Sequence, residues 1–97
     1  MKLRLTSRAL ADLDDNNIYL TPRSPQGALN VKAAILATFE TLKTLPRSGK
    51  LQTTPGVRKL GVARYPHNIF YGVDDDADEI VIFTIFHTSR DRDYTDT

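Results

Sequence analysis

The chain contains no cysteine and no tryptophan, and its 97 residues include only one methionine and five glycines. Without cysteine it can form no disulfide scaffold, no thiol nucleophile and no cysteine-ligated zinc or iron centre. The glycines are too scattered to build a phosphate-binding loop or a dinucleotide-binding motif, and no serine is flanked by glycines as in the hydrolases. The sequence therefore gives no support to redox, nucleotide-binding or serine-hydrolase activities.

Long apolar runs are also missing. The longest, Ile80–Phe86 with Thr84 inside it, is far shorter than the roughly 20 residues that a membrane-spanning helix needs. The N-terminus starts with basic residues but has neither the apolar stretch nor the cleavage site of a secretion signal. The length suits a single domain over residues 1–97. We therefore expect one cytoplasmic globular domain with no membrane partner.

The net charge of +1 hides an asymmetry along the chain. Residues 1–66 carry eleven Lys or Arg and four Asp or Glu, whereas residues 67–97 carry two and eight. Residues 43–64 form a basic segment without a single acidic residue, and its cations are Lys43, Arg47, Lys50, Arg58, Lys59 and Arg64. Such a segment can attract phosphates or an acidic protein, or it can be an ordinary solvated loop and strand.

The first half of the chain has helical periodicity. Leu3 and Leu5 alternate with the basic residues Lys2 and Arg4, which predicts a short strand over residues 3–5. Ser7 is the expected N-cap of a helix that ends before Pro22. Ser24 and Pro25 then predict the start of a second helix, which is about 20 residues long and ends at Pro46. A short turn containing proline joins the two, so we expect a helical hairpin.

The second half has the two-residue period of strands. Strands are predicted over residues 57–63, 69–73 and 79–86, with an acidic hairpin loop at 74–78. The resulting fold is α+β: an N-terminal strand, a helical hairpin, and a three-stranded antiparallel sheet with the hairpin packed on one face.

The last predicted strand is apolar on both faces. Its alternation puts Ile80, Ile82 and Phe86 on one face and Val81, Phe83 and Ile85 on the other. Two helices cover only one face of a small sheet, so the second set needs another cover. The cover is either a partner protein, which we favour, or the C-terminal tail.

Neither a metal nor a cofactor is expected. His67 and His87 are the only histidines and lie twenty residues apart, and the acidic run 74–78 lacks the glycine and the terminal glutamate of a calcium-binding loop. The remaining candidates for chemistry are Arg58, Arg64, Tyr71, His87 and Arg90. A histidine and several arginines can cleave a phosphodiester, because the histidine moves a proton while guanidinium groups stabilise charge on phosphate. Alternatively, the arginines are surface charges, Tyr71 is part of the core and His87 ends a strand.

Six segments fall, in order, as they do in the ParE/RelE superfamily of toxins, which the chain resembles over residues 3–92. They are Ser7–Leu13, Ile18–Tyr19, Leu45–Gly49, Val57–Leu60, Tyr65–Tyr71 and Glu79–Arg90. The resemblance implies the toxin of a bacterial type II toxin–antitoxin system, suppressed by a small ParD-like antitoxin. In the family the antitoxin's C-terminal segment lies over the toxin's sheet and helices. We therefore expect antitoxin contacts at Val81, Phe83, Ile85 and the exposed edge of the second helix.

The resemblance extends to two activities. ParE-like members poison DNA gyrase, and the Leu45-Pro46-x-x-Gly49 and Tyr65-Pro66-x-x-Ile69-x-Tyr71 patterns look more like this branch. Our first hypothesis is gyrase inhibition by protein binding rather than by catalysis, with target contacts at Arg47, Lys50, Arg58, Arg64, His87 and Arg90.

The alternative is a RelE-like enzyme that cleaves messenger RNA on the ribosome. In that case His87 is the acid/base, Arg58 and Arg64 hold phosphate, and Tyr94 is a candidate terminal tyrosine. A third hypothesis is a relic that only binds its antitoxin and regulates transcription with it.

Overall fold

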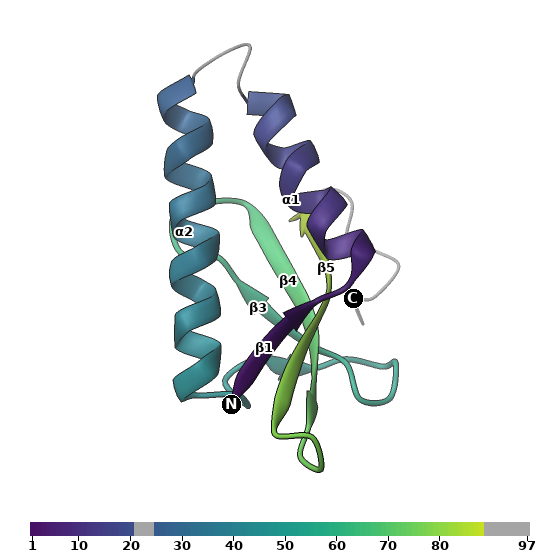
Figure 1. Ribbon diagram of the computed structural model, residues 1–97. Helices are drawn as coiled ribbons and strands as arrows, with labels where there is room; N and C mark the ends of the chain where they lie inside the picture. Colours follow the sequence, from purple (N-terminus) through teal and green to yellow (C-terminus); the bar gives the residue numbers. More distant parts are fainter. Residues whose placement is uncertain (21–24, 89–97) are drawn as a thin grey trace.

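The computed structural model describes residues 1–20 and 25–88, and it combines two helices with one sheet (Figure 1). The elements in chain order are β1 (Lys2–Leu5), α1 (Ser7–Leu20), α2 (Pro25–Thr44), β2 (Lys50–Leu51), β3 (Arg58–Gly61), β4 (His67–Asp74) and β5 (Glu79–His87). The mixed α+β class is as predicted. Neither described helix has the length and the apolar character needed to cross a membrane.

The sheet has five strands in the order β1-β5-β4-β3-β2, so the prediction of a three-stranded antiparallel sheet is wrong. The leading strand β1 pairs parallel to β5, with Lys2 opposite Glu79 and Leu5 opposite Ile82. At the other edge β2 pairs antiparallel to β3 over only two residues, Lys50 and Leu51. A pair of this length produces no recognisable alternation in the sequence, and the partner of β1 lies at the far end of the chain.

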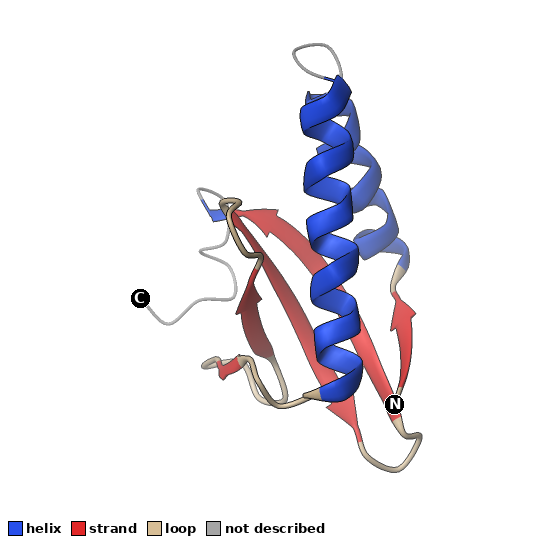
Figure 2. Ribbon diagram, turned by 90° about the vertical axis from the view of Figure 1, so that its left-hand side faces the viewer, coloured by secondary structure: helices blue, strands red, loops and turns tan. Residues whose placement is uncertain are grey.

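The two helices lie side by side but differ in how they meet the sheet (Figures 1 and 2). Helix α2 runs across one face, whereas α1 meets the sheet near β5 and β1 through its first turns. The C-terminal end of α1 and the N-terminal end of α2 extend beyond the sheet (Figure 2). The prediction that a helical hairpin packs as a unit on one face of the sheet is therefore wrong. Its connection and the expected cap Ser24 lie outside the described residues.

One apolar core lies between the helices and the sheet. Along α2, Val31, Ile35, Phe39 and Leu42 are buried, and their helical spacing puts them on one face of the helix. Strands β4 and β5 contribute Ile69, Tyr71, Ile80, Ile82 and Ile85, and Val62 is added just after β3. The core is thus built mainly from one face of α2 and the inner face of β4 and β5.

Helix α1 is capped by Thr6 and not by Ser7, as the sequence had suggested. The Thr6 hydroxyl accepts a hydrogen bond from the Ala9 backbone N–H at 3.1 Å, the bond that an N-cap makes to the third helical residue. The same hydroxyl donates to the carbonyl oxygen of Phe83 at 2.8 Å. Thr6 therefore both starts the helix and ties it to β5, which explains why the cap lies one residue earlier.

Strand β5 contains an irregularity that changes which side chains face the core. Phe70 pairs with Thr84 but the next residue, Tyr71, pairs with Ile82, so Phe83 is bypassed. An extra residue of this kind shifts the alternation of a strand by one. As a result Ile85 is 2% exposed and packs in the same core as Ile80 and Ile82. The prediction that Ile85 shares a face with Val81 and Phe83 is wrong.

The free edge of β5 beyond Ile82 is closed by a carboxylate of α1. Asp12 Oδ2 accepts the Ile85 backbone N–H at 3.1 Å and a short hydrogen bond from the hydroxyl of the buried Thr84. An unpaired N–H at the edge of a buried strand is costly, so Asp12 replaces the missing strand there.

We expect Asp12→Ala to lower the free energy of unfolding by about 2 kcal/mol, because it leaves the Ile85 N–H and the Thr84 hydroxyl without their acceptor. Urea unfolding monitored by circular dichroism measures this change. Asp14→Ala on the same helix removes an exposed carboxylate and is the control, with an expected change within about 0.5 kcal/mol. Equal losses in the two variants would contradict the role of Asp12.

Candidate functional site

The basic segment predicted from the sequence lies at the end of α2 and in β2 and β3. The chain leaves the helix at Leu45, turns through residues 46–49 and enters β2 at Lys50. Antiparallel pairing then places Lys50 opposite Lys59 and Leu51 opposite Arg58. Several of the predicted target-binding residues are therefore neighbours in space as well as in sequence.

Tyr71 anchors the turn from within the core. Its side chain is completely buried, and its hydroxyl accepts the Gly49 N–H and donates to the Pro46 carbonyl oxygen, each at 2.8 Å. A Cβ at residue 49 would lie 2.6 Å from this hydroxyl, so only glycine fits. The reading of Tyr71 as a core residue agrees with this position, and its hydroxyl faces no solvent.

Arg58 also holds the turn. Its Nη1 donates to the carbonyl oxygens of Gly49 at 2.9 Å and Arg47 at 3.3 Å. Carbonyl groups of a turn that leaves a helix need donors, and the guanidinium supplies them. Arg58 is therefore committed, at least through this nitrogen, to fixing the backbone rather than to holding a phosphate.

Arg47 and Lys50 extend outward from the anchored turn. Arg47 Nη2 contacts both carboxylate oxygens of Asp75 at 2.6 and 2.7 Å, which links the turn to the β4–β5 loop. Both side chains of this pair are more than half exposed, so the pair contributes at most about 1 kcal/mol and can be exchanged for another partner. Lys50 is exposed and makes no ion pair with any described residue.

The opposite end of the sheet holds Arg64 and the two histidines. Arg64 is exposed and adopts a left-handed backbone conformation, φ 73°, in the turn between β3 and β4. His67 and His87 are directly opposite each other on β4 and β5, with ring centroids 5.3 Å apart and edge-to-face geometry. Burial lowers the pKa of His67 below its ordinary 6.5, and the neighbouring charge of His87 lowers that pKa further.

These positions do not form one phosphodiester-cleaving site. Arg58 pairs with Tyr71 and His87 pairs with His67, and these β4 partners are four residues apart. At the rise of a strand this is about 13 Å, and the Arg58 side chain is held at the far turn. Arg64 and His87 share one end of the sheet, while Arg47, Lys50 and Arg58 share the other. Arg90 and Tyr94 lie outside the described residues.

The second face of the sheet, opposite the helices, carries Val81 and Phe83 as predicted. Both are partly exposed, and Phe83 packs closely over Gly72, where a Cβ would lie 2.9 Å from the Phe83 ring. The same point would lie 3.0 Å from the Gly56 carbonyl oxygen, so the loop before β3 covers part of this face. Phe86 makes an edge contact with Phe70, and the Arg8 guanidinium lies 4.8 Å from the Phe86 ring centre.

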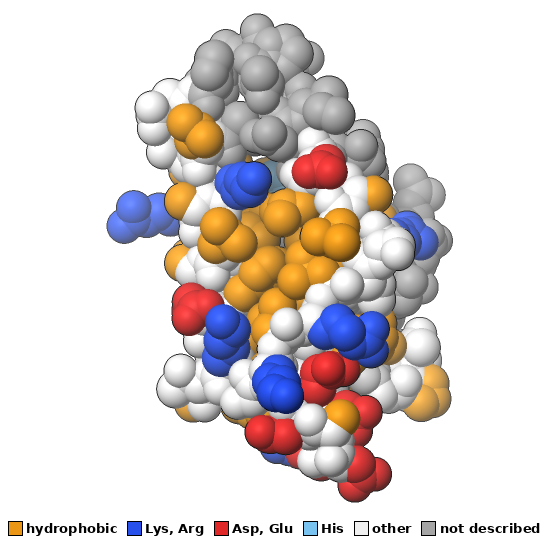
Figure 3. All heavy atoms as spheres, in the orientation of Figure 1, with side chains coloured by type: hydrophobic (Ala, Val, Ile, Leu, Met, Phe, Trp, Pro, Cys, Tyr) orange, Lys and Arg blue, Asp and Glu red, His pale blue; other side chains and the backbone are white. Residues whose placement is uncertain are grey.

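A larger apolar surface lies between α1 and α2 and over β1, where Figure 3 shows apolar side chains gathered in a hollow rimmed by charges. Leu10 on α1 and Leu36 on α2 are 54% and 46% exposed. Partly or fully exposed apolar residues of these three elements include Leu3, Leu5, Leu10, Leu13, Ala34 and Leu36, and we call this set the helix–β1 surface. Apolar areas rimmed by polar groups on small proteins are typical of protein interaction sites.

Within the part of the chain that is described, no three His, Asp or Glu side chains lie close enough to hold a metal ion. The sequence reasoning missed the structural roles of Asp12 and Arg58. Asp12 is one of three aspartates on α1 and Arg58 is one of several cations in the basic segment, so neither carries a distinguishing signal. Their partners lie in other parts of the chain.

Comparison with known proteins gives consistent matches over most of the chain. The family model described as the ParE toxin of the type II toxin–antitoxin system parDE matches residues 3–92. The Sinorhizobium fredii protein named "Putative toxin Y4kP" is 31% identical over 89 residues, which are 92% of this chain and 90% of that protein. A chain of the chromosomal ParDE toxin–antitoxin system from P. aeruginosa is 29% identical, with a TM-score of 0.79 over 90% of this chain and 95% of its own length.

More distant structures share the fold alone. A chain of the RelBE2 toxin–antitoxin complex from Mycobacterium tuberculosis is 24% identical, with a TM-score of 0.64 over 89% of this chain and 95% of that one. The isolated E. coli RelE toxin is 16% identical, also with a TM-score of 0.64, over 94% of this chain and 87% of that one.

We expect Tyr71→Phe to lower the free energy of unfolding by about 1–3 kcal/mol, because it leaves the Gly49 N–H and the Pro46 carbonyl without their partner. Chemical unfolding measures the loss. Tyr65→Phe removes a hydroxyl that bonds to no described residue, and we expect it to leave stability nearly unchanged. A loss in Tyr65→Phe as large as that in Tyr71→Phe would contradict the anchoring role.

Stability should also fall as the pH drops below 6.5. The pKa of His67 is lower in the folded chain than in the unfolded one, so the unfolded chain takes up the proton first and is favoured by acid. We expect His67→Leu to reduce the loss of melting temperature between about pH 7.5 and about pH 5.5, measured by thermal unfolding. Identical pH profiles for the variant and the unaltered chain would refute this assignment.

Proposed function

Because the chain belongs to the ParE toxin family and is the toxin of a type II toxin–antitoxin system, we propose that it inhibits DNA gyrase by direct binding and that a ParD-like antitoxin neutralises it. The relationship to a chain of the P. aeruginosa ParDE system, at 29% identity over nearly its whole length, supports assignment to the ParE branch. The toxin acts in the cytoplasm, where the toxin and its antitoxin are made.

The observation that carries the choice of binding over catalysis is the position of Arg58. Its Nη1 is taken up by two backbone carbonyl oxygens, and about 13 Å of strand separates it from the histidine pair. A phosphodiester-cleaving site needs its acid/base and its phosphate-holding groups around one substrate. In the described structure Arg58 is separated from His87, so the proposed three-residue set is not assembled around one substrate, and this supports gyrase inhibition over RNA cleavage.

The antitoxin covers apolar surface on both sides of the edge strand β1. On one side lies the helix–β1 surface, with Leu10 and Leu36 about half exposed. On the other side Val81 lies beside Arg4, and Phe83 is partly exposed nearby. An amphipathic antitoxin segment that wraps around β1 reaches both areas. Ile85 is left out of this set because it is buried in the core.

The target contacts are the exposed cations Arg47 and Lys50 at one end of the sheet and Arg64 at the other, together with His87, the last residue of β5. Arg90, outside the described residues, is proposed as a further contact. Arg58 contributes by holding the turn that presents Arg47. Exposed cations also accelerate encounter with an acidic partner surface.

The test compares two activities of the purified chain. We expect it to block ATP-dependent supercoiling of relaxed plasmid by DNA gyrase and to leave messenger RNA intact in a translating extract. His87→Ala should weaken the supercoiling inhibition without abolishing it, because His87 is one of several proposed target contacts and transfers no proton. Rapid transcript cleavage with unaffected gyrase, abolished by His87→Ala, would replace this proposal by the ribosome-dependent nuclease.

A further inference from the structure

The exposed leucines fall into two groups, one on the two helices and one at the turn that follows α2, and the second group lies outside the helix–β1 surface. Among the described residues, five large apolar side chains are exposed: Leu10, Leu29, Leu36, Leu45 and Leu51. The first three lie on α1 and α2. Leu45 and Leu51 are 59% and 56% exposed and enclose the turn between α2 and β2. We call residues 45–51 the docking loop.

The docking loop is rigidly held from below. Tyr71 binds it at Pro46 and Gly49, and Arg58 binds it at Arg47 and Gly49, so side chains from two strands hold three of the four residues 46–49. A Cβ at Gly49 would also lie within 2.9 Å of the Lys59 carbonyl oxygen, which shows how closely the loop lies on β3. An exposed loop fixed in this way loses little conformational entropy when it binds, which favours affinity.

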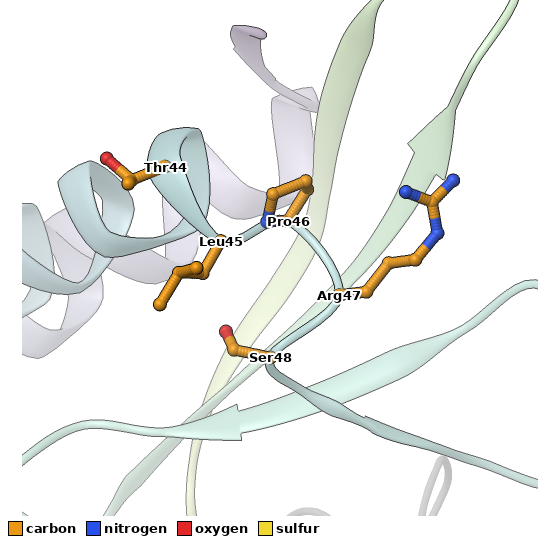
Figure 4. A pocket seen from close by; sticks show the side chains of 5 residues that line it. All are labelled: Thr44, Leu45, Pro46, Arg47 and Ser48. Carbon is orange, nitrogen blue, oxygen red and sulfur yellow. The ribbon is translucent and has the colours of Figure 1, made fainter.

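The side chains of the loop point in two directions. Figure 4 shows Leu45 and Ser48 on one side of the backbone and the Arg47 guanidinium on the other. The residues that line the adjoining surface hollow of about 430 Å³ are Thr44, Leu45, Pro46, Arg47 and Ser48. Lys50 adds a second cation, and residues 43–64 contain no acidic side chain. The loop thus combines apolar groups with cations in a small area.

We propose that the docking loop binds the protein target of the toxin, at a surface that offers an apolar pocket for Leu45 or Leu51 beside carboxylates for Arg47 and Lys50. This inference rests on the proposed function, because it assigns the target contact of the same toxin. Asp75 holds Arg47 in the free chain through an exposed ion pair, and a target carboxylate takes its place. RNA is a poorer fit, since phosphates would pair with the cations but would leave both leucines in water.

The experiment measures inhibition of gyrase supercoiling by loop variants and by matched variants elsewhere. We expect the double variant Leu45→Ser/Leu51→Ser and the single variant Arg47→Glu each to need about tenfold more protein for half-inhibition. Leu29→Ser removes a leucine that is also 59% exposed, and Arg4→Glu reverses a cation that is also in an exposed ion pair. These two controls should stay within about twofold of the unaltered chain.

Melting temperatures and circular dichroism exclude variants that fail to fold, and all five substituted residues are exposed. Full inhibition by the loop variants, or an equal loss in Leu29→Ser and Arg4→Glu, overturns the docking loop. If the unaltered chain arrests growth but does not inhibit gyrase, the proposed function fails. Growth arrest by the same four variants then tests whether the docking loop binds the target. Arrest by the double leucine variant equal to that by the unaltered chain then overturns the loop as well, whereas its selective loss supports it.

Discussion

The structure depends on how the hydrogen-bonding edge of β5 is completed. β1 pairs with this edge only from Glu79 to Ile82, and then the chain turns away into α1. From that point side chains take over: Thr6 donates to the Phe83 carbonyl and Asp12 accepts the Ile85 N–H. Both residues also fix the start of α1 against the sheet. The position of the first helix therefore follows from the need to satisfy backbone groups of the last strand.

The irregularity at Phe83 has an equally wide effect, because it divides the apolar residues of β5 between two uses. Ile80, Ile82 and Ile85 enter the core, whereas Val81 and Phe83 stay on the second face. Without the extra residue, one regular alternation would have turned Ile85 outward. The same strand thus completes the core and still offers apolar groups to a partner, which a small domain with helices on one face could not otherwise do.

Local signals in the sequence were sufficient for most elements but not for their assembly. The two helices, the hairpin of β4 and β5 and the buried stripe of α2 follow from spacing, proline and glycine. The parallel pairing of β1, the two-residue strand β2 and the shift at Phe83 do not, because each depends on contacts between segments distant in the chain.

The candidate site shows the same limit. The sequence places Arg58 and Tyr71 in predicted strands and His87 just after one, but only the pairing register shows that Arg58 and His87 belong to opposite ends of the sheet. The actual partners of Arg58 are carbonyl groups, which no composition reveals.

The parallel pairing of β1 with β5 also sets the order in which the molecule can be completed during synthesis. Lys2 pairs with Glu79, 77 residues later, and β5 lies between β1 and β4 in the sheet. Until β5 has emerged from the ribosome, the N-terminal strand has no neighbour and the core lacks Ile80, Ile82 and Ile85. The nascent chain therefore cannot complete either its core or the apolar surface around β1 before β5 has been synthesised.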